Sequence, residues 1–260
     1  MILLLGGTSE AGTIAAALAA AGVRVLVSSA TDLASSVGES DLVRVRAGAL
    51  DDEGLVALIA ATGARAVVDA THPYASLVTQ HAQHAAARAR VPYLRYLRPA
   101  ALTPASGVVI AADHEEAAIR AFLPGRPVLL TIGTRNLAPY LREARRTSVP
   151  VVARVLPAPE SLRACERAGL SREQVIPGQG PFTVDQTVEI IRRHGIGVLV
   201  TKDGGIEGGA PEKLEAARRE GCETVVVARP EERCVAGRTY TKIVALVDAC
   251  VAAQTPPEGE

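Results

Sequence analysis

Short apolar runs alternate along the chain with longer stretches whose apolar residues recur at the helical period. The runs are rich in Val and Ile, which is typical of strands in a parallel sheet that helices cover on both faces. The expected strands are Ile2–Leu5, Arg24–Ser28, Ala66–Asp69, Val128–Thr131, Val151–Arg154, Val198–Thr201 and Thr224–Ala228. The pattern therefore predicts an α/β fold class.

Two helix starts carry capping signals. Asp113-His-Glu-Glu116 and Thr183-Val-Asp-Gln186 both match the capping box, in which the first side chain and the side chain three residues later satisfy two free N–H groups. Gly195 is expected to end the second of these helices.

A change of composition from Arg98 to Gly107 is followed by a strand-helix unit and by a further break at Pro124-Gly-Arg-Pro127. We place the domain boundary at this second break. Because the second half repeats the alternation without repeating the sequence, the chain is expected to form two Rossmann-like parallel-sheet domains. They would span residues 1–125 and 126–254, with a disordered tail at 255–260.

Charge and cysteine content restrict the kinds of partner and site that the chain is expected to have. Basic and acidic residues number 28 each in a chain of 260, and no basic block suggests a nucleic-acid partner or a membrane surface. The four cysteines form no C-x-x-C pair, so neither a metal site nor a disulfide framework is expected. The apolar start has no basic segment before it, and we expect a cytoplasmic protein with a small-molecule ligand.

The stretch LLLGGTSEAG, residues 3–12, places two glycines and two hydroxyl side chains between a strand and an Ala-rich helix. Such a turn lets backbone N–H groups and a helix start approach a pyrophosphate. The full G-x-G-x-x-G fingerprint is absent, so tight packing is the alternative. The residues expected to bind a dinucleotide here are Gly6, Gly7, Thr8, Ser9, Glu10 and Ala11.

Ser28 and Ser29 follow the second strand, where an NAD-specific site usually has Asp or Glu. Small hydroxyls tolerate a 2′-phosphate, which favours NADPH, with NADH as the alternative because Asp32 is close.

DATHPYA, residues 69–75, follows a later strand and brings Ala70, Thr71, His72 and Pro73 to the same sheet edge. We expect these residues to contact the cofactor; a capping or packing role for His72 is the alternative. His81 and His84 lie one helical turn apart but have no third ligand nearby, so no metal is expected.

Positive side chains stand at or beyond several strand ends, and a cleft that gathers them would suit a substrate with several carboxylates. Each alone would be a solvated surface cation. Two glycine-rich segments, 178–183 and 202–209, read as loops that close over a ligand. The residues expected to bind substrate are Arg95, Arg98, Arg135, Arg154, Gln179, Lys202 and Lys213.

Taken together, the motifs resemble one family, the precorrin-6A reductases of cobalamin biosynthesis, including the cobalt-precorrin-6A reductases. The residues that carry the resemblance are LLLGGTSEA (3–11), DATHPYA (69–75), VPYLRYLRP (91–99), ARVLP (153–157), GQGPFT (178–183), VTKDGG (200–205), GGAPEK (208–213) and ARP (228–230). They occur in family order over almost the whole chain.

The resemblance implies a nicotinamide-dependent oxidoreductase with two Rossmann-like domains that exchange their last strands. The N-terminal domain would hold NADPH or NADH, and the C-terminal domain the tetrapyrrole. A hydride would pass to a carbon of the macrocycle and a proton to its neighbour, without metal or flavin. His72, Tyr74 and Asp203 are the candidate proton donors, with bound water as the alternative, and transient contacts with neighbouring pathway enzymes are expected.

Three other functions are weighed. A short-chain dehydrogenase or epimerase is disfavoured because no Tyr is followed by Lys four residues later. A methyltransferase of the same pathway would transfer a methyl group and leave NADPH unoxidised. A non-catalytic dinucleotide-sensing module would leave the cationic strand ends without a ligand.

Overall fold

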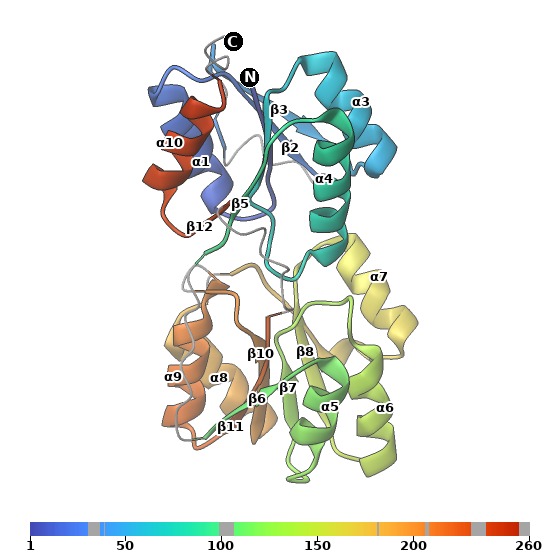
Figure 1. Cartoon of the computed structure of the whole chain (residues 1–260). Coiled ribbons are helices and arrows are strands. Elements are labelled where there is room, and N and C mark those ends of the chain that lie inside the picture. Colours follow the sequence, from blue (N-terminus) through green and yellow to red (C-terminus); the bar gives the residue numbers. More distant parts are fainter. Residues whose placement is uncertain are drawn as a thin grey trace. The chain divides into compact units, whose positions relative to one another are not determined.

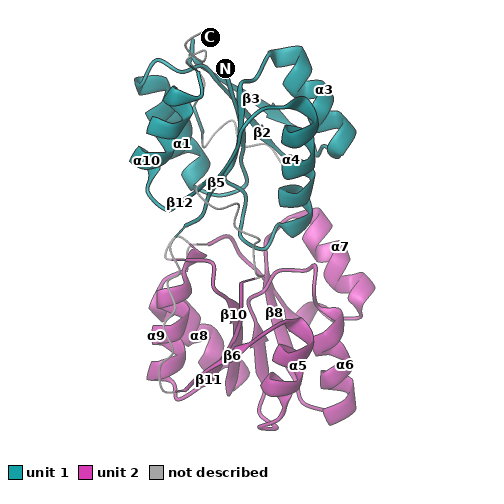
Figure 2. Ribbon diagram, in the orientation of Figure 1, with its two compact units in different colours: residues 1–99, 231–260 teal, residues 100–230 magenta. Residues whose placement is uncertain are grey.

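The structure is a computed structural model that describes residues 1–30, 37–38, 40–98, 107–180, 182–205, 208–229 and 238–254. The chain forms two compact units (Figure 2). Unit 1 comprises Met1–Pro99 and Glu231–Glu260, and unit 2 comprises Ala100–Pro230. Each unit has its own parallel sheet, as the alternating pattern predicts.

The sheet of unit 1 has six parallel strands in the order β12-β5-β4-β1-β2-β3 (Figure 1). Its strands are β1 (Ile2–Leu5), β2 (Val25–Ser29), β3 (Val43–Ala47), β4 (Ala66–Asp69), β5 (Tyr93–Tyr96) and β12 (Thr239–Tyr240). The helices of this unit are α1 (Glu10–Ala20), α3 (Asp52–Thr62), α4 (Ser76–Ala89) and α10 (Ile243–Ala252).

Both faces of this sheet carry an apolar core. Because successive side chains of a strand point to opposite faces, one strand contributes to both cores. On β1, Ile2 and Leu4 belong to the core that contains α1 and α10 residues, and Leu3 and Leu5 to the core that contains α3 and α4 residues. The continuous apolar run of this strand thus follows from its central place in the sheet.

Unit 2 has a second six-stranded parallel sheet, in the order β6-β11-β10-β7-β8-β9. Its strands are β6 (Val108–Ala111), β7 (Val128–Leu130), β8 (Val151–Val155), β9 (Val175–Pro177), β10 (Val198–Lys202) and β11 (Glu223–Val227). The helices are α5 (His114–Phe122), α6 (Ala138–Thr147), α7 (Pro159–Ala168), α8 (Val184–His194) and α9 (Ala210–Arg219), with a 3₁₀ turn at Arg172–Gln174.

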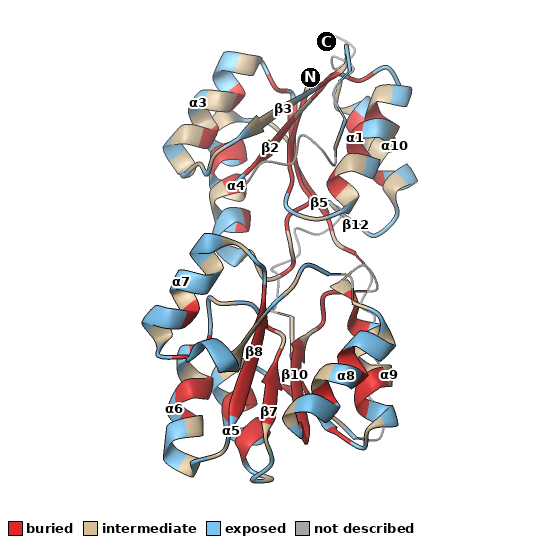
Figure 3. Cartoon of the chain, turned by 180° about the vertical axis from the view of Figure 1, so that it is seen from behind, coloured by how far each residue is buried: buried red, intermediate tan, exposed pale blue. Residues whose placement is uncertain are grey.

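The interior of unit 2 is built in the same way. The strands β7 and β8 are buried along their length and β10 is buried up to its last residue, whereas the helices expose their outer faces (Figure 3). One apolar core joins Leu129 and Leu199 of the sheet to Val188 and Ile191 of α8.

The two sheets exchange one edge strand each. β6 follows the first five strands of unit 1 in the sequence but lies in the sheet of unit 2, and β12 follows the strands of unit 2 but lies in the sheet of unit 1. β6 pairs with β11, and β12 pairs with β5. With these strands in the sixth place, both sheets have the Rossmann strand order 3-2-1-4-5-6. The expected exchange of last strands is confirmed.

The division between the units differs from the predicted boundary at residue 125. Because β6 pairs with β11 and α5 packs against β11, residues 108–123 belong to unit 2. The Pro124–Pro127 break is a helix-to-strand loop inside that unit, and the chain passes from one unit to the other within the Arg98–Gly107 stretch. The predicted second domain is also wrong at its end, since β12 and α10 belong to unit 1.

The predicted helix signals have their expected effects, with one difference. Thr183 and Gln186 form the capping box of α8, and Gly195 ends it in the left-handed conformation. Asp113 caps α5, but the Glu116 carboxylate accepts the N–H of Ala112 rather than that of Asp113.

Cys165, Cys222 and Cys250 are buried free thiols, and burial raises the pKa of Cys250 to about 12. Asp32, Cys234 and the predicted disordered tail at 255–260 lie outside the described residues. Within the described ranges, every helix is too short or too polar to cross a membrane.

Candidate functional site

The carboxyl ends of β1 and β4 meet at the switch point of the unit 1 sheet, where ligands of open α/β sheets bind. The N–H of Gly6 donates to the carbonyl of Ser28 (2.8 Å), and the Thr8 hydroxyl donates to the carbonyl of Ala70 (3.0 Å). These two bonds fix the glycine loop against the ends of β2 and β4.

The start of α1 is suited to an anion. Ser9 occupies the N-cap position, but its side chain makes no capping hydrogen bond and instead donates to the Glu10 carboxylate (3.1 Å). A Cβ added at Gly7 would meet no atom within 4 Å, so the loop leaves open space beside the helix start. The predicted loop therefore fits the pyrophosphate of a dinucleotide.

Glu10 and Arg98, which were predicted to bind cofactor and substrate respectively, form an ion pair with each other. Both side chains are largely buried. The ion pair thereby links Glu10, the first residue of α1, to the segment that follows β5.

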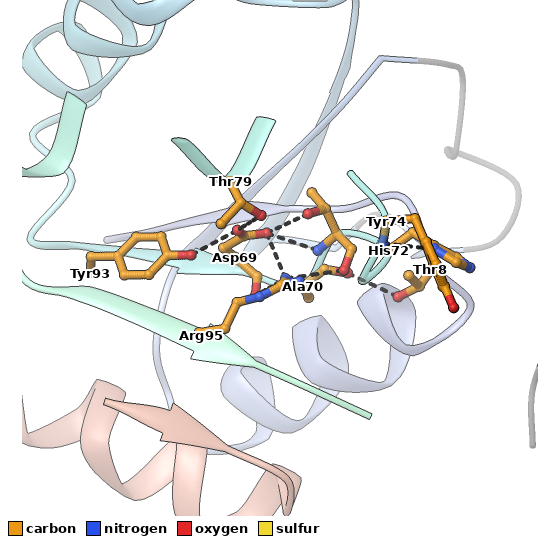
Figure 4. A network of polar contacts seen from close by, with 9 residues as sticks. Thr8, Asp69, Ala70, His72, Tyr74, Thr79, Tyr93 and Arg95 are labelled. Atoms are coloured by element: carbon orange, nitrogen blue, oxygen red, sulfur yellow. Dashed lines mark hydrogen bonds and ion pairs between the residues drawn. The ribbon is translucent and has the colours of Figure 1, made fainter. Parts of the chain in front are cut away.

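Asp69 at the end of β4 is the centre of a buried polar network (Figure 4). Its Oδ1 accepts hydrogen bonds from the backbone N–H and the hydroxyl of Thr71 and from Arg95 (3.0, 2.7 and 3.0 Å). Its Oδ2 accepts from the hydroxyls of Thr79 and Tyr93, both at 2.8 Å. Burial and the Asp69 charge raise the pKa of Tyr93, so this phenol remains a donor.

Arg95 has a different place from the predicted one. Its side chain is 3% exposed, and its Nη1 also donates to the carbonyls of Asp69 and Thr71, each at 3.1 Å. A guanidinium held by these three oxygens positions the loop after β4. It does not extend toward solvent, where a substrate carboxylate would have to approach.

His72 and Tyr74 lie together on the loop that follows Asp69 (Figure 4). Their ring centroids are 5.5 Å apart, and the backbone N–H of Tyr74 donates to His72 Nδ1 (3.3 Å). When Nδ1 accepts a hydrogen bond, the neutral imidazole carries its proton on Nε2. Ala70, Thr71 and Pro73 of the same loop are buried.

The end of β2 contains a cation that the sequence reasoning missed. Arg46 of β3 donates from Nη1 to the Ser28 hydroxyl (2.9 Å). Ser29, next along β2, is buried and its carbonyl accepts the N–H of Gly48 (2.9 Å). The two predicted serines are therefore brought together with a guanidinium.

Unit 2 contains a cavity of about 220 Å³ at the carboxyl edge of its sheet. Thr131 after β7, Arg154 on β8, Phe182 and Lys213 of α9 line it, together with glycines from the 178–180 and 208–209 segments. Arg154 donates to the Thr187 hydroxyl (3.2 Å) and its guanidinium lies 3.9 Å from the Phe182 ring centroid. Lys213 Nζ donates to the carbonyl of Gly208 (2.7 Å).

The electrostatics of this cavity favour an anion. Burial lowers the pKa of Arg154 to about 10, and burial together with the charges of Arg154 and Lys202 lowers the pKa of Lys213 to about 8. Burial and the nearby Arg135 also lower the pKa of Lys202. Among the described residues, Arg154 has no carboxylate within ion-pair distance, so a bound carboxylate would relieve the repulsion between these cations.

Two other predicted residues of unit 2 differ in setting. Gln179 is exposed, between two glycines that line the cavity. Asp203 is largely buried and its Oδ1 accepts from Arg229 (3.2 Å), so this carboxylate is ion-paired rather than placed as an acid.

His114 at the start of α5 was not anticipated as a site residue. Its Nδ1 lies 2.9 Å from the hydroxyl of the buried Tyr140. Burial and the charge of Lys202 lower the pKa of His114, so it is neutral near pH 7. Its place directly after the Asp113 cap, beyond a strand, is the signal that sequence reasoning could have used.

The two histidines of α4 lie beside one carboxylate of α3. His81 Nε2 and His84 Nδ1 lie 3.8 and 3.4 Å from the Asp52 carboxylate oxygens. A set of three His, Cys, Asp or Glu ligands is not found in the part of the chain that the structure describes.

The fold and the two sites define an α/β enzyme with two Rossmann-type units, one with a glycine loop at its switch point and one with a cationic cavity. A family model described as "Precorrin-6x reductase CbiJ/CobK" matches residues 1–251, and the chain belongs to this family. The motifs from LLLGGTSEA to ARP thus gave the correct family.

Named relatives agree with this assignment. A cobalt-precorrin-6A reductase of Priestia megaterium is 33% identical, over 96% of this chain and 98% of its own length. A precorrin-6A reductase of Rhodococcus erythropolis is 34% identical, over 88% of this chain and 89% of its own. The solved structure of a CobK precorrin-6A reductase matches with a TM-score of 0.75 and 27% identity, and covers 100% of this chain and 99% of that one.

Proposed function

We propose that the chain is an NADPH-dependent precorrin-6A reductase that converts the precorrin-6A macrocycle to precorrin-6B. The family match over residues 1–251 supports the reaction class. The observation that carries the proposal is the uncapped start of α1 beside an open glycine loop, at the switch point of a Rossmann-ordered sheet.

The residues of unit 1 fit a nicotinamide dinucleotide. The backbone from Gly6 to Ala11 would bind the pyrophosphate, Ser28 and Ser29 the adenosine ribose, and residues 70–73 the nicotinamide end. The reduced nicotinamide supplies a hydride when bound. The Asp69 network holds the 70–73 loop rigid, which positions the reacting groups and contributes to catalysis through orientation.

The cations of unit 2 would bind the substrate. A precorrin carries acetate and propionate carboxylates, and the cavity at Arg154 and Lys213 is large enough for such an arm. Lys202 and the exposed Arg135 and Gln179 would contact further carboxylates or the rim of the macrocycle. Arg95 and Arg98 serve instead to position the loops of unit 1, because both are ion-paired there.

The proton that accompanies the hydride is assigned to His72. Its Nδ1 accepts a backbone hydrogen bond, which leaves Nε2–H as the donor atom. Tyr74 is the second candidate because its ring lies beside the imidazole. Asp203 fits this role less well because Arg229 holds it as an ion pair.

Two substrates and two cofactors are the alternatives within the family. The relatives with 33% and 34% identity are named for the cobalt-bearing and the metal-free substrate respectively, so similarity favours neither. The NADH-dependent cobalt-precorrin reaction is therefore the alternative. A non-catalytic NADP(H)-sensing module would not explain the buried Arg154 of the cavity, whose guanidinium has no carboxylate at ion-pair distance among the described residues.

The test is to mix the protein with NADPH or NADH and with precorrin-6A or cobalt-precorrin-6A, and to follow cofactor absorbance and the tetrapyrrole spectrum together. Stoichiometric loss of NADPH with shortening of the conjugated system is the expected result. An Arg218→Gln variant, on the exposed face of α9, is the control and should behave as the wild type. Cofactor binding without turnover on either substrate would favour the sensing module.

A cytoplasmic location and transient contacts with neighbouring enzymes of the pathway stay predictions. Cell fractionation and cross-linking in a host that makes the corrin ring would test them.

A further inference from the structure

Arg46 occupies the position next to the adenosine ribose of the proposed dinucleotide site. β2 and β3 are neighbouring parallel strands, with Ser28 directly opposite Arg46. Both residues lie near the carboxyl ends of their strands, at the same end of the sheet as the glycine loop that follows β1.

The guanidinium of Arg46 is held in one orientation. Nη1 donates to the Ser28 hydroxyl and to the carbonyl of Gly48 (2.9 and 3.0 Å), and Nη2 donates to the carbonyl of Ala47 (3.3 Å). A Cβ on Gly48 would lie 3.2 Å from Nη2, so glycine at this position leaves room for the side chain. The chain thus fixes a long side chain at a strand end without burying it.

The described contacts of the Arg46 guanidinium are all to neutral oxygens, and no carboxylate of the described ranges lies at ion-pair distance from it. Because a guanidinium has five N–H donors and the described contacts use three, donors remain for an anionic ligand.

We propose that Arg46 and Ser28 bind the 2′-phosphate of NADPH and so determine the choice of NADPH over NADH. The inference rests on the proposed function of unit 1 as the dinucleotide site. In a Rossmann unit the end of the second strand faces the 2′ position of the adenosine ribose. Arginine pairs with phosphate through two parallel hydrogen bonds, and the Ser28 hydroxyl adds a third donor without a negative charge.

The competing explanation is that Arg46 only ties the ends of β2 and β3 together. Loss of this contact between the strands would weaken the binding of NADPH and NADH alike, because the two cofactors are identical except for the 2′-phosphate. The ratio of the two affinities therefore separates recognition from a structural role.

The experiment titrates NADP⁺, NAD⁺, adenosine 2′,5′-bisphosphate and ADP into the wild type, Arg46→Ala and Arg44→Ala by calorimetry. Arg44 is the matched control, since it lies on the same strand but is exposed and two residues from the sheet edge. We expect Arg46→Ala to weaken NADP⁺ and the bisphosphate by about 10- to 100-fold, with NAD⁺ and ADP unchanged and Arg44→Ala without effect.

Two further variants guard against a folding defect. Arg46→Lys keeps the charge but loses the bidentate geometry, and should bind NADP⁺ between the wild type and Arg46→Ala. Ser28→Asp adds a carboxylate beside Arg46 and should reverse the preference toward NAD⁺.

Equal loss of both cofactors in Arg46→Ala, or no loss of either, would overturn the inference while leaving the dinucleotide site in place. If the wild type bound neither cofactor, the proposed function of unit 1 would fail together with it. Normal NADP⁺ selectivity without reduction of any precorrin would retain the inference and overturn the proposed reaction.

Discussion

The guanidinium of the buried Arg154 lies against the ring of Phe182, 3.9 Å from its centroid. A cation on an aromatic face is attracted by the negative charge of the ring face, and the guanidinium keeps donors at the edge of its plane besides the one that the Thr187 hydroxyl accepts. Arg154 is therefore held in place while still able to bind a carboxylate in the cavity.

Replacement of Arg154 by Met is expected to raise KM for the tetrapyrrole by roughly 10- to 100-fold, because one charge-assisted hydrogen bond pair is lost. The dissociation constant of NADPH should not change, since Arg154 belongs to unit 2. Steady-state kinetics and a nucleotide titration measure the two effects separately. An unchanged KM would exclude this cavity as the carboxylate site.

Gly178→Ala is expected to disturb the same site through Phe182. A Cβ at residue 178 would lie 2.6 Å from Cζ of that ring, so the ring has to shift from its present position against Arg154. Gly180→Ala is the matched control, because its Cβ would lie at an ordinary 3.5 Å from the ring. KM should rise in the first variant only; the same KM in both would mean that the ring position is unimportant.

The affinity for substrate should fall as pH rises through about 8, the pKa of Lys213. Below that pH the ammonium is charged and attracts a carboxylate; above it the amine is neutral and the attraction is lost. A bound carboxylate would raise the pKa, so the fall should occur at higher pH in the complex than in the free enzyme. The pH profile of kcat/KM reports the pKa in the free enzyme and that of kcat the pKa in the complex. Lys213→Gln should abolish the fall around pH 8; persistence of the fall would assign it to another group.

Asp69→Asn is expected to destabilise the fold by about 3–5 kcal/mol, because Arg95 would keep a buried charge without its partner. The double variant Asp69→Asn/Arg95→Met should recover part of that loss. Denaturant unfolding gives both values. Glu53→Gln, which removes an exposed ion pair with Arg88, is the control and should change stability little; an Asp69→Asn variant as stable as this control would contradict the network's role.

His72→Gln is expected to lower kcat by about 10²- to 10⁴-fold if the imidazole supplies the proton, with little change in KM. Tyr74→Phe keeps the backbone N–H that binds His72 Nδ1 and should retain most of the activity. Rapid-quench measurement of a single turnover isolates the chemical step. Normal turnover in His72→Gln would transfer the role to Tyr74 or to bound water.

Strands that are buried on both faces can be predicted from the sequence, because nearly all of their residues are apolar. β1 and β4 agree with their expected bounds to the residue, and both lie at the centre of their sheet. Strand β3 was missed because it lies at the sheet edge, where the alternating Arg44 and Arg46 break the apolar run. Because the strand was missed, Arg46 near its end was missed as a site residue too.

Strand β5 was missed for a different reason. Arg95 lies within a fully buried strand, where a charge is not expected, and its ion pair with Asp69 stabilises the charge there. Asp69 itself was part of a quoted motif, but no sequence pattern shows that five hydrogen bonds converge on one carboxylate. The pairing of Glu10 with Arg98 is likewise a contact across 88 positions that local patterns do not report.

The domain boundary could not be read from composition because the exchange of β6 and β12 depends on pairing alone. During synthesis the first sheet has no sixth strand until Thr239 and Tyr240 have left the ribosome, after the whole of unit 2. The N-terminal unit therefore cannot mature before its neighbour, as independent domains normally do. A chain cut at the midpoint would yield two incomplete sheets, and both halves would need to be produced together to regain them.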